Sequence, residues 1–211
     1  MYAQTSTEYL PSVMRTFAMS IAFAFLGSIA GMFVPPALFM PLVFVELGML
    51  LFAFLIRRKK LISYTFLYTF TFISGITTYP VVAYYAAASG GNTVLLALAT
   101  TTVVFTGIGV YATKSKRNFS WMGGMLVAAL LALIAISIFN IIWPLSSTGM
   151  LAFSFIGVLV FSGYVLFDFS RMKHYGVSAE EVPLMALNLY LDFLNLFTSI
   201  LRIFGILGSD D

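Results

Sequence analysis

The sequence NLYLDFLNLFTSILR, residues 188–202, combines the composition of a lipid-buried helix with a regular series of polar side chains. The polar residues follow one another at steps of 4, 3, 4 and 3, and they are Asn188, Asp192, Asn195, Ser199 and Arg202. These steps place them on one face of a helix, while Leu, Phe, Tyr and Ile cover the rest of its circumference. Such a polar seam is expected to face other helices or a water-filled path, because lipid would leave its hydrogen bonds unmade.

The whole chain has the composition of a membrane protein. Of its 211 residues, 61% are hydrophobic and only 9% are charged, whereas soluble domains average about 25% charged residues. Apolar runs of about 20 residues recur, each long enough to cross roughly 30 Å of hydrocarbon as a helix. The runs cover residues 13–33, 38–56, 61–85, 93–113, 119–142, 149–174 and 183–205. We therefore predict an all-α membrane protein, a single seven-transmembrane-helix domain over residues 1–211.

The loops between these runs predict the orientation in the membrane. Turn-forming residues in 35–36, 89–92 and 144–149 mark one side, and the basic loops mark the other. The cations on the basic side are Arg15, Arg57, Arg58, Lys59, Lys60, Lys114, Lys116, Arg117, Arg171 and Lys173. The positive-inside rule then predicts a cytoplasmic N-terminus, and an odd number of spans places the C-terminus outside. Because short loops divide these cations, we expect contact with lipid headgroups and no nucleic-acid partner.

Three acidic residues lie within the predicted spans, namely Glu46, Asp168 and Asp192. A charge at the centre of a spanning helix costs roughly 2.5–3.5 kcal/mol on insertion scales. Each of these residues is therefore expected to face the protein interior, where it finds a partner or carries a proton.

Depth in the membrane suggests that two of the acids meet. If Gly176 caps the sixth helix, Asp168 lies about 12 Å from that end, and a last helix that begins near Pro183 carries Asp192 about 13 Å in. The competing signal is a capping box in residues 178–181, which would start the last helix earlier and offset the two depths. If the carboxyl groups meet, both cannot ionise cheaply, so the pair is expected to share a proton and to respond to pH.

Arg57 is the candidate countercharge for this pair. It ends the second span, and Glu46 lies eleven residues earlier on the same helical face, because eleven residues make almost three turns. The other cations of the run 57–60 are interpreted as a topology signal. Arg57 is nearest to the membrane, and we expect it to reach Asp168 at the cytoplasmic end of the sixth helix.

Three segments carry a resemblance to a known family. They are FSGYVLFDFSRMKH (residues 161–174), LNLYLDFLNLFTSILRIFG (187–205) and FISGITTYPVV (72–82). They resemble the Bax inhibitor-1 family of transmembrane proteins, and the length, the loop pattern and the closing SDD are similar to its bacterial YetJ-type members. The similarity covers nearly the whole chain.

The resemblance implies a fold in which the last helix is surrounded by the other six, and a calcium-leak activity that is sensitive to pH. Asp168 and Asp192 match the paired sensor aspartates of the family, Arg57 matches the basic residue that latches one of them, and Glu46 matches an acidic residue on the ion path. The implied setting is a bacterial plasma membrane, with a functional monomer and no tightly bound cofactor. Calcium is then the permeant ion, and protons are the regulator.

The oxygen ligands available suit a weak calcium path. Calcium binds about six to eight oxygen atoms, and the candidates Asp168, Asp192, Asn188, Asn195 and Glu46 supply only some of them. We expect a weak calcium site at the two aspartates, because conduction requires that a bound ion can leave again.

Two other classes of function use intramembrane acids. Aspartyl intramembrane proteases have small residues before the second aspartate, in a Gly-x-Gly-Asp motif, whereas residues 189–192 here read Leu-Tyr-Leu-Asp. A proton-coupled transporter would need broken helices in matching halves, and only Pro80, after Thr77 and Thr78, is a candidate for local unwinding of a span. We therefore predict a channel that is not an enzyme, with the transporter as the main alternative.

Overall fold

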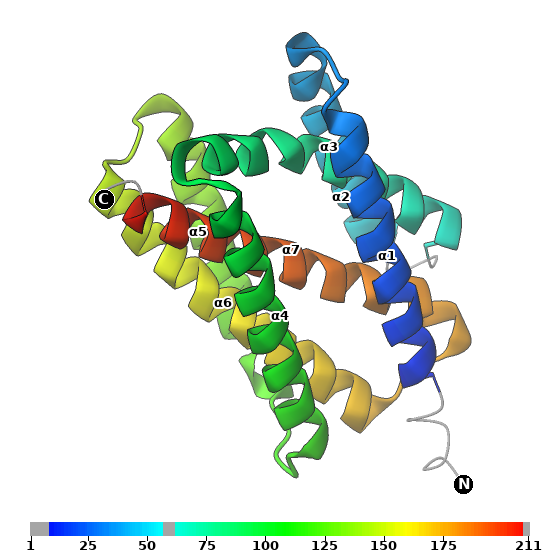
Figure 1. Cartoon of the computed structure of the whole chain (residues 1–211). Coiled ribbons are helices and arrows are strands. Elements are labelled where there is room, and N and C mark those ends of the chain that lie inside the picture. The colour runs from blue at the N-terminus through cyan, green and yellow to red at the C-terminus, as the bar shows by residue number, and fades with distance from the viewer. Residues whose placement is uncertain (1–8, 57–61, 209–211) are drawn as a thin grey trace, which may run out of the picture. The chain divides into compact units, whose positions relative to one another are not determined.

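A computed structural model describes residues 9–56 and 62–208 of the chain. Within these ranges the protein consists of α-helices and short 3-10 helices, with no β-strand (Figure 1). The α-helices are α1 (Leu10–Gly31), α2 (Phe39–Ile56), α3 (Tyr64–Ser89), α4 (Gly91–Lys114), α5 (Gly123–Ile142), α6 (Ser147–Tyr175) and α7 (Val182–Leu207). All seven are long and apolar enough to cross a membrane, which confirms the predicted fold class.

The helix boundaries differ from the predicted spans by a few residues, and the largest difference lies between α3 and α4. A turn was expected over residues 89–92, but Ser89 ends α3 and Gly91 already begins α4. Gly90 makes the whole connection with a φ of 85°, a left-handed conformation that glycine adopts without steric cost. One residue therefore suffices where the sequence pattern indicated four.

The connection between α6 and α7 contains both the glycine cap and the capping box that its sequence predicts. Gly176 has a φ of 76° directly after the end of α6, as expected of a C-terminal cap. The capping box is also present, because the Ser178 backbone N–H and hydroxyl both donate to Glu181 Oε2 at 2.9 Å. It begins the 3-10 helix η3 (Ala179–Glu181), which continues directly into α7 at Val182. The helical chain therefore starts earlier than Pro183.

Pro80 does not break α3, so the suggested unwinding of this span is wrong. The helix is continuous from Tyr64 to Ser89. The Thr78 hydroxyl donates to the Ser74 carbonyl at 2.7 Å, and the Thr77 hydroxyl lies 3.0 Å from the same oxygen. Proline removes a single backbone hydrogen bond from this helix. In a membrane a fully unwound segment would leave several polar groups unsatisfied, so the continuous helix is the cheaper solution.

The described chain forms two compact units. Unit 1 comprises Met1–Ala83 and Tyr175–Tyr190, and unit 2 comprises Tyr84–His174 and Leu191–Asp211. The helices α3 and α7 each contribute residues to both units. The assignment of the chain to a single domain stays a prediction.

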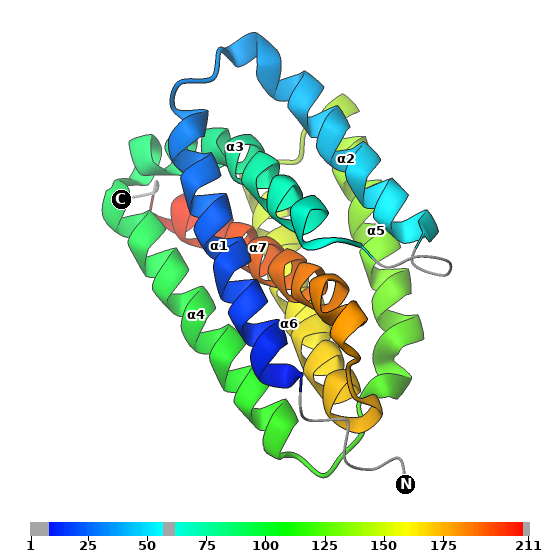
Figure 2. The same cartoon turned by 90° about the vertical axis from the view of Figure 1, so that its right-hand side faces the viewer.

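In unit 1, α3 lies between α1 and α2 (Figure 2). Two glycines allow α1 and α3 to approach closely, because a Cβ atom on Gly27 would overlap the Phe72 carbonyl and one on Gly75 would overlap the Ala24 carbonyl. Small residues at such crossings are typical of helix packing in membranes, where close van der Waals contact drives association.

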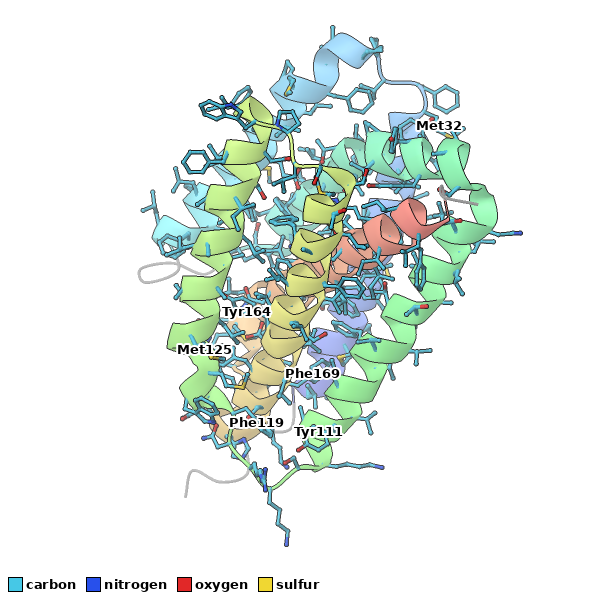
Figure 3. The ribbon with its side chains drawn as sticks, turned by 90° about the vertical axis from the view of Figure 1, so that its left-hand side faces the viewer. Met32, Tyr111, Phe119, Met125, Tyr164 and Phe169 are labelled. Carbon is cyan, nitrogen blue, oxygen red and sulfur yellow. The ribbon has the colours of Figure 1, made fainter. Side chains whose placement is uncertain are left out.

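In unit 2, α6 lies between α4 and α5 (Figure 3). The ring of Phe169 packs against Gly109 of α4, and Leu126 of α5 packs against Gly163 of α6. The C-terminal part of α7 joins this unit through the Ser89 hydroxyl, which donates to the Gly205 carbonyl at 2.8 Å. These contacts hold α6 and α7, which carry the two aspartates.

The last helix is the most buried of the seven. In its most apolar stretch 61% of the residues are buried, against 6–33% in the other helices. This burial is typical of a helix that contacts protein over most of its length. That the other six helices surround α7 stays a prediction.

Candidate functional site

The centre of the candidate site is a pair of carboxyl groups within unit 2. Asp168 lies on α6 and Asp192 on α7, and each side chain is only 5% exposed. Their carboxyl groups lie close enough to act on each other through charge and hydrogen bonding. The structure therefore brings together the two aspartates that the depth argument paired. A hydrogen bond between two carboxyl groups requires that one of them is protonated, because a carboxylate can only accept.

One oxygen of this pair has no partner. Asp192 Oδ2 is buried and forms no hydrogen bond with any of the described residues. Buried polar atoms are almost always paired, and one that is unpaired calls for an explanation such as a proton, a bound ion or water. The site can therefore accept a further proton or offer an oxygen to a cation.

Two residues beside the pair were missed as site residues by the sequence reasoning. The charges of both aspartates act on the hydroxyl group of Tyr164, which lies on α6 four residues before Asp168. The charge of Arg171, three residues after Asp168 on the same helix, acts on that carboxyl group. The signal that could have found them is this spacing, because residues three and four apart on a helix are neighbours. Arg171 was instead interpreted only as a topology signal.

Two further residues of the polar seam bond to α7 itself. Asn195 Nδ2 donates to the Leu191 carbonyl and the Ser199 hydroxyl donates to the Asn195 carbonyl, both at 2.7 Å. The Ser199 hydroxyl and one N–H of the Asn195 amide are therefore used within the helix. The Asn195 side-chain oxygen is not used in that bond and stays a candidate ion ligand. Asn188 belongs to unit 1, where it is half-buried.

Unit 1 contains a second polar cluster, built around Glu46 of α2. The Thr77 hydroxyl lies 2.5 Å from Glu46 Oε2 and 3.0 Å from the Ser74 carbonyl. The charge of Glu46 also acts on Tyr190 of α7. The hydroxyl groups of Tyr190 and Ser74 interact with each other, although neither oxygen forms a hydrogen bond of regular geometry with the described residues. Glu46 thus has a hydrogen-bond donor from the neighbouring helix.

The remaining predictions concern the latch and the metal. Arg57 lies outside the described residues. Among residues 9–56 and 62–208, no three His, Cys, Asp or Glu side chains gather into a group that could hold a metal ion. A calcium ion at the aspartate pair would find two carboxyl groups and would need other oxygen ligands, such as water.

These features define an integral membrane protein of seven apolar helices with a buried pair of carboxyl groups. Residues 6–209 match the family described as "Inhibitor of apoptosis-promoting Bax1". The chain belongs to this family, the Bax inhibitor-1 family, as its motifs suggested.

Three relatives illustrate the range of the family. The chain is 33% identical over 204 residues to the uncharacterized protein Cj0236c of Campylobacter jejuni, which covers 92% of this chain and 87% of the relative. It is 34% identical over 149 residues to Bax inhibitor 1 of Schizosaccharomyces pombe, covering 71% of this chain and 54% of the relative. It is 37% identical over 111 residues to the inner membrane protein YbhL of Escherichia coli, covering 48% and 47%. The name of the second relative describes an inhibitor, and the name of the third describes an inner membrane protein.

Proposed function

We propose that the protein is a pH-sensitive calcium leak channel. The observation that carries the proposal is the buried, hydrogen-bonded pair of Asp168 and Asp192, with an unsatisfied oxygen on Asp192. A pair that shares one proton carries a single negative charge, and a second proton makes it neutral. The charge inside the membrane therefore changes by one unit as the pH falls.

In our proposal, Arg57 is the latch that opens or closes the ion path when the charge of the pair changes. With one shared proton on the pair, Arg57 neutralises the remaining negative charge and closes the cytoplasmic end of the path. When the second proton arrives, Arg57 loses its partner where solvation is poor, and its flexible side chain moves toward cytoplasmic water. Acidification then favours the open state. Neutral acids bind calcium less well, so the net flux passes through a maximum at an intermediate pH.

The ion path of the proposal uses weak and incomplete ligands. Asp168 and Asp192 form a weak calcium site, and Glu46, Asn188 and Asn195 supply further oxygen atoms along the path. A complete shell of six to eight oxygens would retain the ion, whereas a partial shell lets it leave. Calcium is the permeant ion here, and the proposal needs no tightly bound cofactor.

Two observations favour this proposal over its alternatives. A protease would need room for a catalytic water and a substrate strand between its aspartates, whereas Asp168 and Asp192 interact directly. A transporter would be expected to use broken helices at its substrate site, whereas α3 is continuous through Pro80.

The test is calcium flux into liposomes that contain only this protein, measured across a range of pH. The leak proposal expects calcium entry that rises as the pH falls below neutrality, relative to protein-free liposomes. Absence of flux at every pH would overturn it. Calcium entry that requires a proton gradient at constant pH would favour the proton-coupled transporter.

The latch is tested by two matched arginine variants. Arg57→Ala should leak even at alkaline pH, because the negative pair has lost its latch. Arg171→Ala is the control, because Arg171 is an exposed arginine that acts on Asp168 from the same helix. Leakage at alkaline pH from Arg171→Ala alone would show that the wrong arginine was chosen. Tight closure of both variants would remove the latch from the mechanism.

We also propose a bacterial plasma-membrane location with the N-terminus in the cytoplasm, the C-terminus outside and the monomer as the functional form. The chain contains no cysteine, so a single introduced cysteine is the only thiol of the protein that can react. Lys116→Cys in the basic loop should resist an impermeant maleimide added to intact cells, and Ser146→Cys in the opposite loop should react. The reverse pattern would invert the orientation.

A further inference from the structure

A groove on unit 2 lies between α4 and α6, away from the aspartate pair's own contacts. It has a volume of about 300 Å³ and is lined by Gly107, Ile108, Tyr111, Ser162, Gly163 and Leu166. Its lining atoms are almost entirely apolar, and a Cβ atom added to Gly107 would meet nothing within 4 Å. The volume is at the lower end of the roughly 300–1,000 Å³ of ligand sites, and a slender apolar group such as part of an acyl chain fits it better than a bulky ring system.

On both α4 and α6, a lysine lies on the same helical face as residues that line the groove. On α4, Gly107, Tyr111 and Lys114 are four and three residues apart, and on α6 Leu166 and Lys173 are seven residues apart, which are the spacings of one helical face. A contact shows that these faces converge, because Lys173 Nζ donates to the Ser115 carbonyl at 2.6 Å. We call this end of α4 and α6 the basic end.

The positive charge at the basic end has no compensating acid nearby. The only acids among the described residues of unit 2 are Asp168 and Asp192, which are buried and interact with each other. Lys114 is exposed and forms no ion pair with an acid in the described chain. Lys173 uses one hydrogen-bond donor on Ser115, and an ammonium group has three.

Aromatic side chains mark the depth of this end. Tyr111, at the lower end of the groove, forms a ring pair with Phe119 at a centroid distance of 6.0 Å, and Figure 3 shows both residues at the same end of unit 2. Trp121, two residues further on, is 74% exposed. Tyr and Trp are enriched where the hydrocarbon core meets the lipid headgroups. The groove thus begins at headgroup depth and extends into the hydrocarbon region.

We propose that this groove is a binding site for one anionic phospholipid. An acyl chain lies against Gly107, Ile108 and Leu166, and the phosphate contacts Lys114 and the free donors of Lys173. Lysines at the end of a helix also compensate its dipole, but that role needs no groove and no convergence of two helical faces. The proposal is independent of calcium leak, because it concerns lipid bound on the outer face of α4 and α6.

Quenching of tryptophan fluorescence by brominated acyl chains tests the site. The reporter is Val103→Trp in a background with Trp121→Phe and Trp143→Phe, because Val103 is 71% exposed and lies one turn from Gly107. The comparison reporter is Leu131→Trp, 61% exposed on α5. In phosphatidylcholine vesicles, a small fraction of brominated phosphatidylglycerol should quench the first reporter more than the same fraction of brominated phosphatidylcholine. The second reporter should not distinguish the two lipids.

Two pairs of variants identify the groove and its charge. Lys114→Gln should weaken phosphatidylglycerol binding about fivefold, the loss expected of one cationic contact with an anionic headgroup. Lys116→Gln, also exposed but in the loop beyond the end of α4, should have little effect. Gly107→Leu should fill the groove and remove the preference, whereas Gly124→Leu, also with open space at its Cβ position, should leave it intact. Equal quenching by both lipids, or a preference that survives Lys114→Gln and Gly107→Leu, would overturn the proposal.

Discussion

The two units each bury an acid within membrane-spanning helices, but they satisfy it in different ways. In unit 1, Glu46 is half-buried and accepts a hydrogen bond from the Thr77 hydroxyl of the neighbouring helix. In unit 2, Asp192 is 5% exposed, its partner is another acid, and its Oδ2 atom has no hydrogen bond with the described chain. A carboxyl group therefore has a hydroxyl partner in unit 1 and an acidic partner in unit 2.

This difference bears on the pH response that we propose. The hydrogen bond between Thr77 and Glu46 takes its proton from the Thr77 hydroxyl group. Asp168 and Asp192 can form their mutual hydrogen bond only while one of them holds a proton. We therefore place the proposed response to pH in unit 2.

The largest effect is expected from Asp192→Asn. The amide retains the shape and can hydrogen-bond Asp168, but the pair loses one titrating group, so calcium flux should become nearly independent of pH while the protein still folds. The measurement is liposome flux across pH, with size-exclusion chromatography to monitor folding. A variant that still follows the wild-type pH curve would show that Asp192 is not part of the sensor.

Glu46→Gln should have a smaller effect of a different kind. The amide oxygen can still accept from Thr77, but the negative charge is lost from the proposed path, so flux should decrease several-fold while its pH profile keeps its shape. The same flux assay measures both quantities. If the pH of half-maximal flux moves as far as in a sensor variant, the contrast between the two units is wrong.

Much of this arrangement was predictable from the sequence, because a lipid bilayer restricts both the length of a spanning helix and the positions at which it can carry a charge. Apolar runs predicted all seven helices, and the cost of buried charge singled out the three acids within them. The seam of α7 also follows directly from its spacing. These inferences need only local pattern and the energetics of the bilayer.

The rest depends on contacts that no local pattern encodes. Thr77 donates to Glu46 across thirty-one positions of sequence, and the groove beside Gly107 is lined by residues of both α4 and α6. The influence of Asp192 on Tyr164 required knowledge of which face of α6 meets α7. A sequence gives the face of each helix, but the pairing of faces is a tertiary property.

Tyr164→Phe tests whether the Tyr164 hydroxyl group affects the pH dependence of calcium flux. The hydroxyl group lies where the charges of both aspartates act on it, and a phenol O–H that turns toward a carboxylate favours the negative form of the pair over the neutral form. Its removal should therefore move the pH of half-maximal flux upward, by up to about one pH unit for a difference near 1.4 kcal/mol. The maximal flux should change little. A downward shift, or a shift in Tyr111→Phe of the same size, would contradict this role for Tyr164.

The smallest effect is expected in unit 1, where Thr77→Val removes the donor to Glu46 and leaves the volume of the side chain nearly unchanged. Hydrogen bonds between membrane helices contribute about 1 kcal/mol each, so unfolding in mixed micelles should show a loss of about that size. Thr78→Val is the matched control, because the Thr78 hydroxyl donates only to the Ser74 carbonyl of its own helix. Since Thr77 and Thr78 are adjacent and both contact Ser74, the difference between the two variants isolates the bond to Glu46. Equal losses would mean that Glu46 gains nothing from Thr77, and the acid of unit 1 would then be as poorly satisfied as Asp192 in unit 2.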